Sequence, residues 1–436
     1  MCIRVLKNFL KLASILALSI AIGYIALVLA YSLPTGKIHQ HISRSYSNIS
    51  NVEFLIPNRE ETHIDNFTDS ISLLEAEYDN TNSAWVESLL NPRLTSLDEN
   101  GQIIPPATVF LSYHTDGNLN YQRADYPRYW HGYLIFLKPL LFFLDYGQIK
   151  TLMATTQILL VAASLMVTAR KFGYVYAIPL CMTYLFLSPL TIAMSAQYNR
   201  VFLITWIQML VIPLCADRYK RSTLLWVYHF FIVGILVAYF DYLTFPLVAF
   251  GVPFVFASLL CVNKFSTVLK RLVTAGFAWC CGYAGMWVSK WALGTLITGI
   301  DVFANAQGAA NFESGTVNGT EQFNYLDVII RELHARPAFL LFCLLAVVLT
   351  YIFVRYATHS SHQSAELALA ACIFAISAAM PIVWYCVFSA HTWIHSMEYR
   401  ELAIFVCGCG SIVALLLKRN PTTHENLRPR LPWNHS

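Results

Sequence analysis

Residues 9–33 read FLKLASILALSIAIGYIALVLAYSL, an apolar run that contains a single charge, Lys11. A helix that crosses a bilayer needs about 20 predominantly apolar residues, so this run is long enough to span a membrane. Basic residues precede it, as they do in a signal peptide, but the apolar core of a signal peptide is only about 7–15 residues long. We therefore expect an uncleaved transmembrane helix at the N-terminus.

The same kind of apolar run recurs along the whole chain. Of the 436 residues, 57% are hydrophobic and 12% are charged, whereas an average soluble domain is about one quarter charged. Such a composition cannot cover a water-facing surface. The sequence therefore predicts an all-α, polytopic transmembrane bundle of about ten spans. After the first, the expected spans are 151–169, 174–195, 201–216, 222–243, 246–262, 272–293, 338–354, 367–389 and 401–417.

Two long hydrophilic segments interrupt the spans, and the first is long enough to fold into a small cap. Directly after it, the apolar stretch 133–144 is too short to span and predicts an interfacial or re-entrant helix. The expected organisation is an N-terminal transmembrane helix (1–33), a first loop with the interfacial helix (34–150), spans two to seven (151–293), a second loop (294–337), spans eight to ten (338–417) and a tail (418–436).

Basic residues set the expected orientation, because short cytoplasmic loops of membrane proteins are enriched in Lys and Arg. With the N-terminus inside, every cytoplasmic segment carries such residues, and the short outer loops hold only Arg200 and Arg400. We expect both termini in the cytoplasm and both long loops outside. The chain would lie in the plasma membrane, or in the endoplasmic reticulum with its outer face in the lumen if the source is eukaryotic.

The eleven cysteines do not predict a disulfide scaffold. Cys2 is at the N-terminus and the others lie in or beside apolar runs, outside the two long loops. The chain has no C-x-x-C pair. We expect these residues to be small apolar packing groups.

The densest polar cluster ends the first long loop, where Asp116 and Asp125 precede the sequence Arg128-Tyr129-Trp130-His131. Tyr and Trp are common at the membrane interface, so an aromatic belt explains part of this cluster. A belt does not require Arg128 and His131 beside an acid, and a functional site is the competing interpretation.

Two smaller clusters lie at the outer ends of later spans. Arg200 is at the outer end of the third span, where its side chain could simply reach the interface. Asp241 lies in an apolar stretch of about forty residues, and an acid at such a depth is costly and usually paired. Structural pairing, with Arg200 or Arg400 as the candidate partner, is one interpretation, and a functional role for Asp241 is the other.

The fourth cluster follows the ninth span and contains His391, His395, Glu398 and Arg400. In a continuous helix the two histidines and the glutamate would share one face. This spacing is compatible with a metal site, with phosphate binding by charged imidazoles, or with internal pairing. It lacks the H-E-x-x-H pattern of zinc proteases. No motif requires a cofactor, although a divalent cation is compatible with the cluster.

The predicted topology places all four clusters on the outer side of the membrane. The cytoplasmic loops contain basic anchors and no Gly-rich nucleotide loop. The sequence thus gives no sign of cytosolic nucleotide chemistry or of a nucleic-acid partner.

Acids, arginines and histidines beside an interfacial helix suit a lipid-linked anionic substrate. Arginine binds phosphate through two parallel hydrogen bonds. A carboxylate such as Asp116 or Asp125 could deprotonate an acceptor hydroxyl that attacks a sugar. Positive groups such as Arg128, Arg200 or Arg400 could stabilise the departing lipid phosphate.

This layout resembles the C-type glycosyltransferase superfamily (GT-C), integral membrane enzymes that use polyprenyl-phosphate sugars. The resemblance rests on architecture: the first helix with its N-terminus inside, the long first outer loop (34–132), the interfacial helix (133–144) and the aromatic outer turns. It implies a polyprenyl-phosphate sugar donor, a glycan, lipid or protein acceptor, and a catalytic acid in the first outer loop, for which Asp116 and Asp125 are the candidates by position. The first acid after helix one is Glu53, later than in many members.

Two other functions remain open. A glycan polymerase or ligase shares the span number and outer arginines, but typically carries its long loop late in the chain. A transporter or flippase of a lipid-linked or anionic substrate would place ionisable groups within several spans. Here His229 and Lys290 are the notable ones.

Overall fold

The fold was obtained as a computed structural model, which describes residues 2–49, 55–56, 59–115, 117–314, 316–317, 320–321, 323–357 and 364–418. These residues are mostly helical, and their four short strands form two antiparallel pairs, β1 with β2 and β3 with β4. The predicted all-α class is confirmed. The ten cysteines whose side chains are described are all free, as expected.

The helices and strands follow in this order: α1 (Cys2–Tyr31), α2 (Thr35–Ser45), η1 (Tyr46–Asn48), η2 (Glu60–Thr62), α3 (Asn66–Glu77), α4 (Ala84–Leu90), β1 (Arg93–Thr95), α5 (Pro106–Tyr113), β2 (Gln122–Ala124), α6 (Leu134–Phe143), α7 (Tyr146–Phe172), η3 (Tyr174–Ala177), α8 (Ile178–Phe186), α9 (Pro189–Met194), α10 (Ala196–Leu214), α11 (Ala216–Arg221), α12 (Thr223–Phe240), α13 (Val248–Cys261), α14 (Phe265–Thr298), α15 (Val302–Glu313), β3 (Thr316–Val317), β4 (Thr320–Glu321), α16 (Tyr325–Ala335), α17 (Pro337–Ala357), α18 (Ser364–Val387), α19 (Ser389–Ile394), η4 (Ser396–Leu402) and α20 (Ala403–Lys418).

Six helices of the described residues are long and apolar enough to cross a membrane, and the chain is compatible with an integral membrane protein. They lie on six of the ten expected spans, the first, second, fifth, eighth, ninth and tenth. The expected spans on α8–α9, α10, α13 and α14 are helical but shorter or less apolar. The six candidate spans are Leu6–Tyr31, Tyr146–Phe172, Thr223–Phe240, Pro337–Tyr356, Ala368–Val387 and Ser396–Leu417.

The expectation of one continuous span over 174–195 is wrong, because the chain breaks after α8. Ser188 adopts a left-handed backbone conformation with φ of 58°. The following Pro189 disfavours the α-helical conformation of the residue before it, so the helix cannot continue. Arg336 donates hydrogen bonds to the carbonyls of Leu185 and Phe186 in the last turn of α8.

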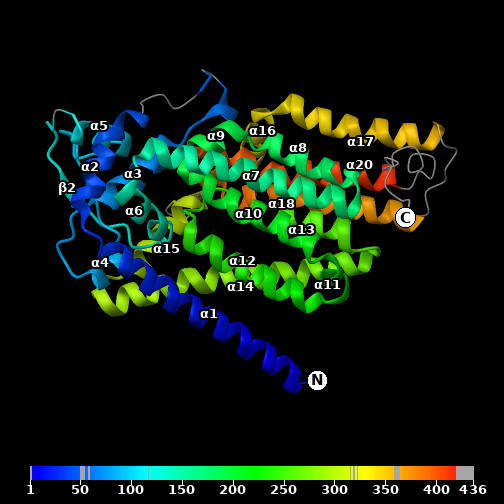
Figure 1. The fold of residues 1–436 in the computed structure, drawn as a ribbon, viewed down its shortest axis with the longest axis horizontal. Helices are drawn as coiled ribbons and strands as arrows, with labels where there is room; N and C mark the ends of the chain where they lie inside the picture. Colours follow the sequence, from blue (N-terminus) through cyan, green and yellow to red (C-terminus); the bar gives the residue numbers. More distant parts are fainter. Residues whose placement is uncertain are drawn as a thin grey trace, which may run out of the picture.

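At one end of the molecule, α2 to α6 gather around the C-terminal end of α1, and we call this region the cap (Figure 1). The helix expected at 133–144 is confirmed as α6, and it packs against α1, α2 and α3. Its Lys138 is fully buried; the ammonium group donates to the carbonyl of Ala76 at 3.0 Å and lies over the ring of Tyr31. This lysine therefore fastens the cap to the first helix.

Helices α12 and α14 run side by side for most of their length because two glycines let their backbones touch. A Cβ atom on Gly282 would collide with the carbonyl oxygen of Phe231, and one on Gly234 would collide with the carbonyl of Trp279. Small residues at such positions are a common way for membrane helices to pack closely.

We predict that Gly282→Ala destabilises the protein by about 1–3 kcal/mol, because the new methyl group must push two backbones apart. The matched control is Gly276→Ala on the same helix, where the nearest atom is the edge of the Phe250 ring at 3.5 Å. Thermal unfolding in detergent measures both. Equal melting temperatures for the two variants would contradict the close packing.

Candidate functional site at the cap end of the bundle

The carboxylate of Asp69 on α3 joins the cap to the N-terminus of α10. The backbone N–H groups of Ala196 and Gln197 donate to its two oxygens, each at 3.0 Å, and the hydroxyl of Tyr146 donates at 2.7 Å. A carboxylate suits this place because the first N–H groups of a helix are unpaired and carry partial positive charge. Burial raises the pKa of this carboxyl. The contact fixes α10, whose first turns carry the second predicted cluster.

Glu75, further along α3, is a fully buried carboxylate, and residues of the first three predicted clusters lie around it. Its Oε2 accepts a hydrogen bond from the hydroxyl of Tyr133, and it lies 3.1 Å from the hydroxyl of Tyr242 and 2.9 Å from Nδ1 of His131. The guanidinium of Arg200 lies over the ring of Tyr133, 3.6 Å from its centre. Residues far apart in the sequence therefore meet around one acid.

His131 is buried, and its environment favours the neutral ring. Burial lowers the pKa of His131, although the charge of Glu75 opposes this. The neutral ring donates from Nε2 to the carbonyl of Tyr126 at 2.9 Å and accepts the Tyr242 hydroxyl at Nδ1, at 2.6 Å. His131 also has a left-handed backbone, with φ of 55°. Such strain concentrates at functional sites.

Three charged side chains here keep a buried polar atom that has no hydrogen-bond partner in the described part of the chain. These atoms are Nη1 of Arg200, Oε1 of Glu75 and Nε of Arg128. The Nη2 atom of Arg200 is satisfied, since it donates to Ser72 at 2.7 Å. An unpaired buried polar group costs about 1–3 kcal/mol. Several unpaired buried polar groups in one place are therefore expected at a site where the residues serve function at the expense of stability.

The fourth predicted cluster does not form one helix face. Helix α19 ends at Ile394, His395 has an extended backbone, and η4 begins at Ser396. The chain turns back at this break. His391 Nε2 consequently lies 3.2 Å from a carboxylate oxygen of Glu398, and the rings of His391 and His395 are 4.5 Å apart. The residues meet as expected, but through a turn.

His391 is held as an imidazolium. Its Nδ1 donates to Glu313 at 2.6 Å and its Nε2 donates to the carbonyl of Leu243 at 2.7 Å. Burial alone would lower the pKa of His391, but hydrogen bonds with Glu313 and Glu398 outweigh it and raise the pKa to about 10. Burial and the neighbouring charge of His391 lower the pKa of His395 to about 3. The pair thus joins a charged imidazole to a neutral one.

Glu313, His391 and His395 have possible metal-ligand atoms within 4.8 Å of one another. A histidine ligates metals through a neutral ring nitrogen with a free lone pair. Both nitrogens of His391 are occupied as donors, so the geometry favours an ion pair over a metal site.

A cavity of about 50 Å³ lies beside this ion pair. Tyr129 lines it, whereas the adjacent Trp130 anchors the loop by donating to the carbonyl of Met286 at 2.6 Å. The guanidinium of Arg128, also in the wall, lies 4.5 Å from the centre of the Tyr126 ring. The cavity thus holds an arginine and an acid among aromatic walls; other lining residues are Leu243, Trp287, Trp291, Glu313 and Phe388.

An apolar groove of about 700 Å³ runs between α14 and α18 toward this cavity. It covers about 20 Å of α18, given 1.5 Å per residue. Phe388 lines both spaces, and the ring of Tyr283 in the groove lies 4.8 Å from that of Trp287 in the cavity. The groove is lined by Leu247, Leu272, Trp279, Cys280, Tyr283, Ala284, Ala375, Ile376, Ala379, Met380, Val383, Trp384, Val387 and Phe388.

Of the two predicted catalytic acids, only Asp125 is among the described residues, and it does not line this cavity. Asp116 lies outside the described residues. Asp125 pairs with Arg123 at 2.7 Å, and Arg123 also pairs with the buried Glu87 at 2.9 Å. Asp125 is therefore part of an ion-pair network that joins β2 to α4.

The expected pairing of Asp241 with an arginine is wrong. The Asp241 carboxylate accepts hydrogen bonds from the backbone N–H and hydroxyl of Thr244, at 2.8 and 2.5 Å. No ion pair among the described residues joins it to Arg200 or Arg400. Arg400 is fully buried and lies over the ring of Tyr198, 4.1 Å from its centre.

Two important acids were missed in the sequence. Glu75 lies between buried leucines and alanine in α3, and an acid within an apolar helix was a signal that could have identified it. Glu313 ends α15 in the second long loop, where polar residues are common and nothing in the local sequence distinguishes it. Only its contact with His391 reveals its place in the site.

The charge of His391 predicts a pH dependence of stability. Its folded pKa of about 10 lies above the ordinary value of 6.5. The stabilisation is therefore fully present below about pH 6.5 and is lost as the pH rises through about 10, with a slope of up to about 1.4 kcal/mol per pH unit. His391→Gln should flatten this slope, and the exposed His334→Gln should not. Melting curves recorded across this pH range measure how stability changes with pH. If this pH dependence is the same in His391→Gln as in the wild type, the ion pair is refuted.

Comparison with protein-family models, curated proteins and solved structures finds no significant match to this chain. The function is therefore inferred from the residues and contacts described above.

Proposed function

We propose that the protein is an integral membrane glycosyltransferase that moves a sugar from a polyprenyl-phosphate donor to a glycan, lipid or protein acceptor. The observation that carries this proposal is the apolar groove between α14 and α18, which ends beside a small cavity containing Arg128 and Glu313. A long lipid chain joined to a charged, polar head needs this combination.

The groove supports the lipid part of the donor. Ligand sites generally have volumes of about 300–1,000 Å³ and mostly apolar walls, and the groove has a volume of about 700 Å³ with apolar and aromatic walls. Its walls come from helices that we assign to spans seven and nine, so a chain could enter it from the bilayer. The same groove would also suit a flippase, and the reaction must be tested directly.

Arg128 is our candidate for binding the donor phosphate. Its side chain lines the cavity, and its Nε has no hydrogen-bond partner within the described residues. A guanidinium presents paired donors that match phosphate. Tyr126 and Tyr129 flank it, at 4.5 and 5.5 Å from their ring centres, and hold it in place. Arg128 would stabilise the negative charge on the departing lipid phosphate.

Glu313 is our candidate for the general base, in place of Asp116 or Asp125. It lines the cavity, and its side chain is 15% exposed. In the proposed step the acceptor oxygen forms a bond to the anomeric carbon and loses its proton to Glu313. The bond from that carbon to the phosphate oxygen breaks, and the phosphate leaves with the electron pair. His391 orients the carboxylate by its hydrogen bond and does not touch substrate.

The cavity must open before a sugar can enter. Its volume of about 50 Å³ is far below the roughly 300–1,000 Å³ of typical ligand sites, so it is too small for a sugar as it stands. Helix α15 supplies the wall with Ala306, Ala309 and Ala310, whose small side chains let it lie close to α14. Movement of α15 would enlarge the cavity, as lids do in many enzymes.

The proposal keeps the ten-span topology with both termini in the cytoplasm. The cap and the cavity then lie on the extracytoplasmic side of the plasma membrane, or in the lumen of the endoplasmic reticulum in a eukaryote. Lipid-linked donors are energised by their glycosyl phosphate bond, so no nucleotide is needed there.

We predict that Glu313→Gln reduces sugar transfer by about 10²–10⁴-fold, because the base is lost while shape is kept. Asp125→Asn, which changes an ion pair outside the cavity, should stay within a few-fold of wild type. Purified protein is incubated with radiolabelled polyprenyl-phosphate sugars and a crude glycan acceptor, with Asp116→Asn in parallel. Loss in an aspartate variant with retention in Glu313→Gln would reassign the base. If no donor supports sugar transfer and the protein catalyses solute counterflow in liposomes, the proposed enzymatic function is refuted.

We also predict that Ala379→Trp raises the KM for long-chain donors several-fold by filling the groove, with little effect on a short-chain donor. Ala371→Trp, two turns earlier on α18 and exposed outside the groove, is the control. Initial rates against donor concentration separate KM from kcat. Equal effects on long and short donors would show that the groove does not hold the lipid.

A further inference from the structure

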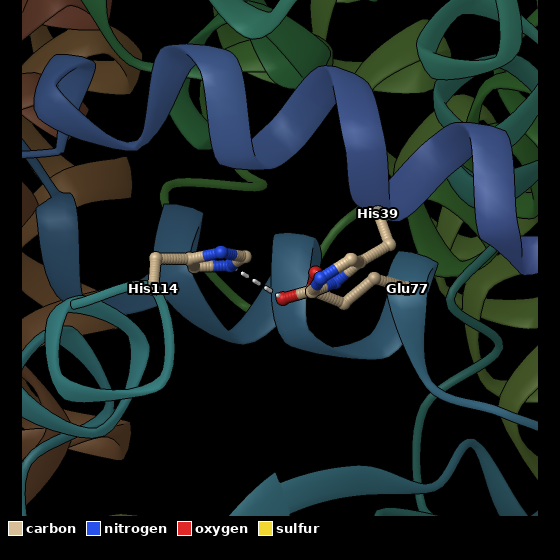
Figure 2. A group of neighbouring side chains, drawn as sticks. All are labelled: His39, Glu77 and His114. Atoms are coloured by element: carbon tan, nitrogen blue, oxygen red, sulfur yellow. Dashed lines mark hydrogen bonds and ion pairs between the residues drawn. The ribbon is translucent and has the colours of Figure 1, made fainter. Parts of the chain in front are cut away.

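A second charged cluster lies in the cap, apart from the site described above. Glu77, the last residue of α3, lies between His39 of α2 and His114, which follows α5 (Figure 2). One carboxylate oxygen of Glu77 is 2.8 Å from His39 Nδ1, and the other is 3.0 Å from His114 Nε2. All three candidate ligand atoms lie within 4.8 Å of one another.

Ser43 closes this cluster on its other side. Its hydroxyl oxygen lies 3.1 Å from His114 Nδ1 and 3.4 Å from His39 Nε2. With both rings neutral and donating to Glu77, their other nitrogens would both be acceptors. One serine proton can satisfy only one of them. An extra proton or a metal ion would satisfy both nitrogens.

A metal ion satisfies all four ring nitrogens. With the metal on His39 Nδ1 and His114 Nε2, each neutral ring carries its proton on the nitrogen that faces Ser43. The serine oxygen has two lone pairs and accepts both N–H groups. Metal-binding histidines usually donate their second nitrogen in this way, which fixes the ring and raises ligand basicity.

Two side chains of the cluster are buried and one is partly exposed, which would let an ion enter from solvent and then be held. The side chains of Glu77 and His114 are each 1% exposed, whereas that of His39 is 45% exposed. The ring of Phe110 lies 4.7 Å from that of His114 and orients it. Two ligands are therefore held rigidly, and the third can move to admit an ion from solvent.

We propose that His39, Glu77 and His114 bind a Zn²⁺ ion that ties α2, α3 and the end of α5 together. Two imidazoles and one carboxylate are a zinc donor set, while Ca²⁺ and Mg²⁺ prefer oxygen ligands alone. Zinc with three protein ligands leaves one position for water.

A zinc ion fits after an adjustment of the ligands. Zinc lies about 2.0–2.2 Å from such ligands in a tetrahedral arrangement, which places the ligand atoms about 3.3 Å apart. The three candidate ligand atoms lie within 4.8 Å of one another, so atoms that are further apart must approach. The contact between the ligating oxygen and its own histidine, now 2.8 or 3.0 Å, must widen. Rotation of the exposed His39 side chain can supply this change. The zinc site is independent of the proposed sugar transfer, since it shares no residue with the cavity.

The test uses the full-length protein, purified in detergent, stripped with EDTA and titrated with Zn²⁺. We expect about one zinc per chain that survives gel filtration, as measured by elemental analysis. His39→Ala should lose it, and Ser43→Ala should weaken binding by about 10–100-fold. The matched control is His41→Ala on the same helix, whose ring contacts the carbonyl of Leu141 at 2.7 Å; it should bind like wild type.

Titration with Co²⁺ gives a readout that does not depend on stability. The wild type should show the visible absorption of tetrahedral cobalt, and His39→Cys should add a thiolate-to-metal charge-transfer band. His39 is half-exposed, so these substitutions should leave the fold intact, as gel filtration verifies. Zinc retained by His39→Ala, zinc lost instead in His391→Ala, or no binding by the folded wild type would each overturn the proposal.

Discussion

The architecture of the cap end depends on the contact between Asp69 and the first turn of α10. The two backbone N–H groups at that helix start have no partner within their own helix, and burial would make them costly. The carboxylate satisfies both at 3.0 Å. The same contact sets α3 against the bundle, and α3 in turn presents Glu75 to the tyrosines and His131. Without this docking, the residues around Glu75 would not meet.

A second constraint is that the guanidinium groups of Arg200 and Arg400 have no carboxylate partner among the described residues. Arg200 lies over Tyr133 and Arg400 over Tyr198, so the faces of aromatic rings take the part that acids were expected to play. Such a contact stabilises a guanidinium yet leaves some of its N–H groups unpaired. An arginine held in this way keeps donors that an anionic ligand can use, whereas one in a bidentate ion pair does not. Arg123, which donates to both carboxylate oxygens of Glu87 and also to Asp125, illustrates the second case.

Much of the helical framework could be predicted, because a span of about 20 apolar residues is a local property. The short helix at 133–144 was found for the same reason. The break at Ser188 was missed although Pro189 marks it, since hydropathy alone does not register backbone geometry. The site was predicted only in part. The sequence identified the polar clusters, but pairing depends on which helices pack together, and so Glu313 could not be joined to His391 in advance.

The two polar centres are connected through α3, although they share no residue. Glu75 and Glu77 are two positions apart, which is about 200° around a helix, so they point to opposite sides. Glu75 faces the tyrosines and His131, and Glu77 faces α2 and the end of α5. Because α3 is buried along almost its whole length, it can only move as a unit. An ion that locks Glu77 therefore also restricts Asp69 and Glu75, and so holds the tyrosines and His131 in place around Glu75.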